Sequence, residues 1–130
     1  MPGHGAFSVY AYKDSRINVQ RLLKTFRGAF PSDPAEQNTA WYKLYRTVQN
    51  EVVVRSAHKA FLLLRDYAAM AAFFLVLFGP WALIAMNKKL VALAYVGLLA
   101  GQYLIVRQAA ANAGVRMVTN VLALKTAAAR

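Results

Sequence analysis

Two uncharged apolar stretches, separated by only three residues, dominate the second half of this chain. They run from Tyr67 to Met86 and from Leu90 to Val106. The first is 20 residues long, about 30 Å as an α-helix, which matches the hydrocarbon thickness of a bilayer. The second has 17 residues and meets the lower limit for a span. The sequence therefore predicts a transmembrane helical hairpin over residues 67–106, with spans at 67–86 and 90–106.

The rest of the chain is too short for a second domain of ordinary size. Only 130 residues are present, 58% of them hydrophobic, and the apolar residues concentrate after Phe61. The alternative is a soluble helical protein with a buried central hairpin, which uncharged runs of this length disfavour. The absence of cysteine excludes disulfides and thiolate chemistry. We therefore predict an all-α membrane protein: a two-span hairpin, a long extramembrane extension of the first span, and amphipathic N- and C-terminal helices.

Residues 1–32 divide into an arm and a basic helix. Residues 1–13 lack a helical period, and we expect an extended arm over a partner surface. From Asp14 to Gly28, Val19, Leu22, Leu23 and Phe26 fall on one face and basic residues on the other. Asp14 or Ser15 can cap this helix and Gly28 can close it. It can lie on an anionic membrane surface or pack on a protein neighbour, and its composition resembles that of mitochondrial import signals.

A second helix starts clearly at residue 33. Asp33 can cap it, Pro34 fits the first turn, and Glu36 completes a capping-box arrangement. Because no glycine or proline follows until Gly79, we expect residues 33–66 to form one long extramembrane helix continuous with the first span. The β-branched run at 52–54 is the place where this helix is most prone to break. A narrow apolar seam along it predicts a partner interface at Trp41, Leu44, Tyr45, Val48 and Val52.

The second span carries three small residues at a spacing of three and four. Ala94, Gly97 and Gly101 would let a neighbouring helix approach closely. Their spacing can also arise by chance in an alanine-rich span. After Arg107 the chain stays helical, and we expect residues 107–130 to form an amphipathic tail.

The basic residues are distributed unevenly about the two spans. Fourteen lie outside the hairpin and two lie in its turn, so the positive-inside tendency places both termini on one side. This is the matrix side of a mitochondrial inner membrane, or alternatively the cytoplasmic side of a bacterial inner membrane or the equivalent side of a thylakoid. No nucleic-acid module accompanies the net charge of +11, which attraction to anionic phospholipid explains instead. The predicted headgroup contacts are Arg16, Lys24, Arg27, Lys59, Arg65 and Arg107.

No residue pattern predicts catalysis or a bound cofactor. His4 and His58 lie in separate segments, no two acids are arranged as a metal or glycosidase site, and no phosphate loop occurs. We expect no enzyme activity, no metal and no cofactor. The architecture suggests an accessory subunit of an energy-transducing membrane complex, such as a respiratory complex or ATP synthase, with other membrane-protein subunits as partners. The alternatives are a self-associating, membrane-shaping scaffold and, with less support from the spans, a small oligomeric channel or transporter.

Overall fold

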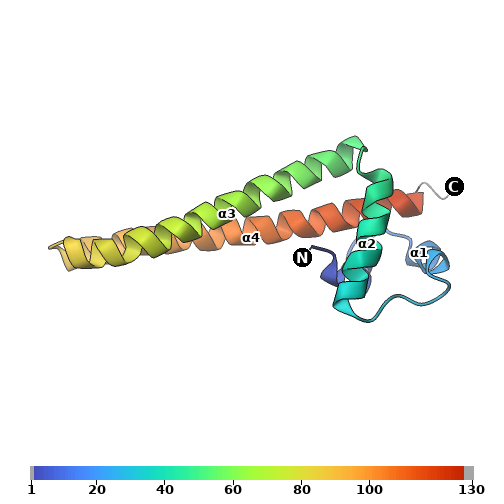
Figure 1. Cartoon of the computed structure of the whole chain (residues 1–130), viewed down its shortest axis with the longest axis horizontal. Coiled ribbons are helices and arrows are strands. Elements are labelled where there is room, and N and C mark those ends of the chain that lie inside the picture. Colours follow the sequence, from blue (N-terminus) through green and yellow to red (C-terminus); the bar gives the residue numbers. More distant parts are fainter. Residues whose placement is uncertain (1, 128–130) are drawn as a thin grey trace. The chain divides into compact units, whose positions relative to one another are not determined.

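A computed structural model describes residues 2–127, all of whose regular structure is helical. Two of its helices are long and apolar enough to cross a membrane, so the predicted all-α class is confirmed. The chain forms two compact units: a terminal unit of residues 2–59 with 113–127, and a two-helix unit of residues 60–112. The elements, labelled in Figure 1, are η1 (Pro2–Gly5), η2 (Tyr10–Tyr12), α1 (Val19–Thr25), α2 (Pro34–Val48), α3 (Val52–Ala85) and α4 (Lys89–Ala127).

Helix α2 begins where its sequence predicts. The Asp33 carboxylate accepts hydrogen bonds from the backbone N–H groups of Ala35 and Glu36, at 2.9 and 3.0 Å, and Pro34 occupies the first turn. These contacts satisfy N–H groups that have no partner within the helix.

The expected continuous helix from residue 33 into the first span is wrong. Helix α2 ends at Val48 and α3 begins at Val52, with a turn over residues 49–51. The break directly precedes the β-branched run. Beyond it Val54 is fully buried and the His58 ring lies 5.7 Å from that of Tyr45. A straight helix could not bring the side chains of residues 45 and 58 together, so tertiary packing outweighs the local preference for continuing the helix.

The expected extended arm is also wrong, because residues 2–12 fold onto the chain itself. The short helix η1 packs against α2, and Ala6 and Phe7 are fully buried. The side chain of Gln37, 2% exposed, holds this segment: its Oε1 accepts from the backbone N–H groups of Phe7 and Ser8, at 3.2 and 3.3 Å. Its Nε2 donates to the Ser32 carbonyl. The N-terminal segment is therefore part of the core of the terminal unit.

The predicted basic helix is shorter than expected and has a different cap. It spans only seven residues, and the side chain of Asn18, not Asp14 or Ser15, accepts from the Arg21 backbone N–H. Gly28 closes it as predicted: its φ of +96° is left-handed, and its N–H donates to the Leu23 carbonyl. Leu22 is 2% exposed, so α1 packs inside the terminal unit.

The end of α4 completes the terminal unit. The Thr126 Oγ accepts from the Asn18 backbone N–H, and the Arg21 guanidinium donates to the Thr126 carbonyl, both at 3.3 Å. Arg16 donates to the Asn120 side chain at 3.1 Å. The apolar α4 residues buried in this unit are Ala113, Met117, Val118, Val121 and Leu122. Segments more than 100 residues apart in sequence therefore share one core.

The two-helix unit consists of the inner parts of α3 and α4, which run side by side in Figure 1. Its buried positions are Ala71, Gly79 and Ala82 on α3 and Ala92 and Val106 on α4, and all but Val106 are small. Gln102 Nε2 donates to the Tyr67 hydroxyl at 2.8 Å across the pair. Small side chains let the two backbones approach closely.

The large apolar side chains of the two-helix unit point away from the chain. Only 17% and 11% of the most apolar windows of α3 and α4 are buried. Ile84 is 84% and Leu90 82% exposed. In a soluble protein the core helices would instead be mostly covered by the chain.

Candidate functional site

The predicted partner seam does not form one surface. Trp41 is 4% exposed and is covered by the chain's own N-terminal segment: a Cβ added at Gly3 would lie 3.0 Å from its ring. The indole N–H is buried without an acceptor in the described part of the chain. Leu44, Tyr45 and Val48 are half-buried, whereas Val52, beyond the break, is 82% exposed.

An aromatic stack connects the helices of the terminal unit. The Tyr45 ring lies 5.5 Å from Trp41, 5.8 Å from Tyr42 and 5.7 Å from His58. The His58 Nδ1 in turn lies 3.4 Å from the Met117 sulfur. The stack joins α2, α3 and α4, and of its rings Tyr42 is exposed, at 52%. Most of the predicted seam therefore serves internal packing.

The predicted helix-packing residues lie on an open face of α4. A Cβ added at Gly97 or Gly101 would meet nothing within 4 Å, and Ala94 is exposed. The small residues that are buried in the two-helix unit besides glycine are others: Ala71 and Ala82 on α3 and Ala92 on α4. The glycine face, defined by Ala94, Gly97 and Gly101, is therefore free of contacts within the two-helix unit.

The predicted headgroup residues differ in their surroundings. Arg16 is committed to the terminal unit, since it pairs with Asp14 at 2.6 Å and bonds Asn120. Arg65 pairs with the neighbouring Asp66 at 2.8 Å. The exposed residues Lys24, Arg27, Lys59 and Arg107 make no ion pair in the described part of the chain. Of the six predicted headgroup residues, these four are the ones left for an anion.

The ion pair of Asp14 with Arg16 predicts a pH dependence. Hydrogen bonds from Arg16 lower the pKa of the Asp14 carboxyl to about 2. A lowered folded-state pKa contributes stability above the ordinary value, which is lost as pH falls through about 2. We expect Asp14→Asn to lower the melting temperature modestly at pH 7, because Arg16 is 59% exposed, and the difference from wild type to shrink from pH 4 towards pH 2. A difference that is independent of pH would contradict this role of the charge.

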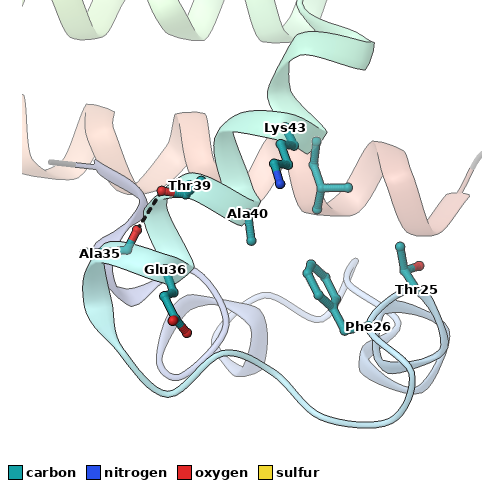
Figure 2. A pocket seen from close by; sticks show the side chains of 8 residues that line it. Thr25, Phe26, Ala35, Glu36, Thr39, Ala40 and Lys43 are labelled. Carbon is teal, nitrogen blue, oxygen red and sulfur yellow. Dashed lines mark hydrogen bonds between the residues drawn. The ribbon is translucent and has the colours of Figure 1, made fainter.

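A groove of about 510 Å³ lies between the end of α1 and one face of α2 (Figure 2). Phe26 forms one wall. Its ring packs against those of Phe7 and Phe30, with centroid distances of 4.7 and 5.8 Å. The other apolar lining residues are Ala35, Ala40 and Leu44. Two small alanines facing a large ring leave the space that forms the groove.

Of the polar side chains that line the groove, the two charged ones are those with hydrogen-bonding groups left for a ligand. Thr25 and Thr39 donate their hydroxyl hydrogens to backbone carbonyls of their own helices. Glu36 and Lys43, seven residues apart on α2 and hence about 10 Å along its axis, make no ion pair among the described residues. The lining of the groove thus combines apolar side chains with one acid and one base.

Sequence reasoning missed Gln37 and the groove. Gln37 lies one turn before Trp41 on the same face of the predicted helix, so a polar residue interrupts the start of the apolar seam. A polar residue at this position on the apolar face indicates a buried amide. The groove had no signal, because Phe26 and α2 meet only through the tertiary fold.

The described residues contain no group of three or more His, Cys, Asp or Glu side chains that could hold a metal ion. Comparison of the chain with protein-family models, curated proteins and solved structures gave no match.

Proposed function

We propose that this chain is a non-catalytic, structural subunit of a larger membrane assembly, such as a respiratory complex or ATP synthase, which it anchors and bridges. The observation that carries the proposal is the open glycine face of α4. Helices in lipid associate where small residues permit close approach. Since α3 does not use Gly97 and Gly101, a helix of another protein is the partner that this face suits.

The terminal unit offers a second surface for neighbouring subunits. Val52, Val53 and Tyr42 are 82%, 52% and 52% exposed although they are large and apolar or aromatic. A bridging subunit needs contact surfaces both within the membrane and outside it. Trp41 is buried and is not part of this surface, so its truncation would destabilise the terminal unit and does not test partner binding.

For location, we propose the mitochondrial inner membrane with both termini on the matrix side. A bacterial inner membrane with cytoplasmic termini, or a thylakoid, is the alternative. The 14-to-2 distribution of basic residues supports this sidedness. The contacts of Arg16 and Asn18 with Asn120 and Thr126 support the shared side, because these pairs cannot form across a bilayer.

We expect cysteines at Ser15 and Asn112 to react with a membrane-impermeant maleimide from the same side, and a cysteine at Asn87 from the other. All three positions are exposed. The measurement is labelling of sealed and of inverted vesicles that carry single-cysteine variants. Opposite accessibility of positions 15 and 112 would refute the two-span topology.

The proposed assembly is tested by Gly97→Leu combined with Gly101→Leu. We expect at least a tenfold loss of the assembled complex, about 1.4 kcal/mol in association free energy, because the added side chains prevent close helix approach. The control is Leu98→Phe, which adds bulk at a position already 74% exposed. The readout is native electrophoresis and mass spectrometry of complexes purified in mild detergent.

The composition of the purified complex separates the proposal from its alternative. Stoichiometric recovery of several different subunits supports a structural subunit. Recovery of this chain alone, as an oligomer sensitive to the same glycine changes, supports a self-associating scaffold. If the double glycine variant gave an unchanged yield of complex, the glycine face would not be the contact surface in either a structural subunit or a self-associating scaffold.

A further inference from the structure

We propose that the groove between α1 and α2 binds one acyl chain of an anionic phospholipid, with the lipid phosphate at Lys43. The inference rests on the membrane location proposed above but not on the identity of any partner subunit. The groove lies entirely within the terminal unit.

The size and lining of the groove suit a lipid chain. Its volume of about 510 Å³ falls within the range of about 300–1,000 Å³ for small-molecule sites. The apolar lining is Phe26, Ala35, Ala40 and Leu44. The hydroxyl hydrogens of Thr25 and Thr39 are already bonded to backbone carbonyls, so neither requires a polar partner from the occupant. An acyl chain can cover such a surface without leaving a polar group unpaired.

The charges around the groove favour an anion at the Lys43 end. Glu36 lies in the first turn of α2, where the helix dipole already stabilises its negative charge. Lys43 lies in the body of the helix and has no ion-pair partner among the described residues. Lys24 and Arg27, both exposed, flank the lining residues Thr25 and Phe26 in sequence. The charge at the groove that lacks a partner is therefore the positive charge of Lys43.

The rigid wall of the groove also supports a binding site. Phe26 is clamped by Phe7 and Phe30, so its ring does not need to be ordered when a ligand enters. Figure 2 shows Lys43 and Ala40 on the side of α2 that faces this ring. A preformed apolar slot with a cation beside it matches the two chemical parts of an anionic phospholipid.

The experiment uses the full chain in vesicles of phosphatidylcholine and phosphatidylglycerol that contain a trace of phosphatidylglycerol with a diazirine on its acyl chain. After illumination, peptide mass spectrometry locates the crosslinks. We expect labelling of the α2 peptide containing Ala40 and Leu44, and separately of residues 67–106. A hairpin that is labelled while the groove is not would overturn the groove proposal and leave the membrane location standing.

Two variants with matched controls test the site. Ala40→Phe fills the groove and should reduce its labelling to background, whereas Thr47→Phe, at an exposed position of α2 outside the groove, should not. Lys43→Glu should reduce groove labelling at least tenfold, and the exposed control Arg46→Glu should leave it within twofold. Circular dichroism of each variant verifies the fold. Persistent groove labelling in Ala40→Phe would overturn the proposal.

Three further outcomes identify the occupant. A phosphatidylcholine probe should label the groove several-fold less than the phosphatidylglycerol probe, and equal labelling would overturn the charge argument. Labelling by diazirine-bearing palmitate without labelling by phosphatidylglycerol would overturn the phospholipid source. A photocrosslinker at Ala40 that captures a protein helix in native membranes would show that the groove is a protein interface instead.

Discussion

Replacing Phe7 by alanine is expected to lower the free energy of unfolding of the terminal unit by about 3–5 kcal/mol. The Phe7 side chain is fully buried and its ring lies 4.7 Å from Phe26 and 5.3 Å from Phe30. The substitution leaves a cavity among rings that cannot all move inward. Unfolding in mild detergent can be followed by Trp41 fluorescence in a Trp81→Phe background, so that one indole reports on this unit.

Tyr12→Ala is the matched control for Phe7→Ala. Tyr12 belongs to the same N-terminal segment but is 64% exposed, so its truncation should change the free energy of unfolding by no more than about 0.5 kcal/mol. Equal effects of the two substitutions would show that this segment is not packed as described.

Gln37→Leu is expected to destabilise the same unit by about 2–3 kcal/mol. Leucine is similar in size but accepts no hydrogen bond, so the buried N–H of Phe7 loses its partner together with the N–H of Ser8. Hydrogen exchange measured by mass spectrometry should speed up at residues 7 and 8 before it does in α4. Gln49→Leu, at an exposed position after α2, is the control and should leave the exchange rates unchanged.

The substitutions Phe7→Ala and Gln37→Leu are coupled because they loosen the same residue: the Phe7 ring anchors it in the core, and Gln37 accepts from its backbone N–H. The double variant should therefore lose less than the sum of the single effects. Additive losses would indicate that the amide and the ring cluster act independently.

The sequence was sufficient for the features that depend on local chemistry or on long apolar runs. The start of α2 followed from Asp33 and Pro34, since the capping carboxylate and the proline act within one turn. The two long apolar helices followed from composition. In both cases the determining residues are neighbours along the chain.

The features that the sequence did not reveal depend on distant residues. The turn at residues 49–51 has no glycine or proline, and its formation accompanies the packing of Val54 and His58. The backbone of the N-terminal segment is held by two side-chain amides of α2, those of Asn38 and Gln37, and such contacts leave no periodic pattern in the sequence. The prediction of one long helix failed because it weighed only local preferences.

The same limit applied to the candidate surfaces. The glycine face could be read from the spacing of Gly97 and Gly101, but only the structure shows that α3 leaves it open. The prediction of a partner at Trp41 is wrong, because the chain's own N-terminal segment covers this residue and no sequence pattern indicates that contact. An apolar stripe predicts that something packs there, not which segment does so.

The terminal unit is discontinuous in sequence, and this sets an order of events during synthesis. Residues 16–21 bond to residues 120–126, so the unit cannot close until nearly the whole chain has left the ribosome. By then both apolar helices have been made, and they can insert before the unit closes. If the two helices span a bilayer, a chain in which only one of them has crossed it leaves the two stretches on opposite sides. Such a chain cannot close this core, and the apolar residues near the end of α4, such as Val118 and Leu122, would stay open to chaperones and proteases.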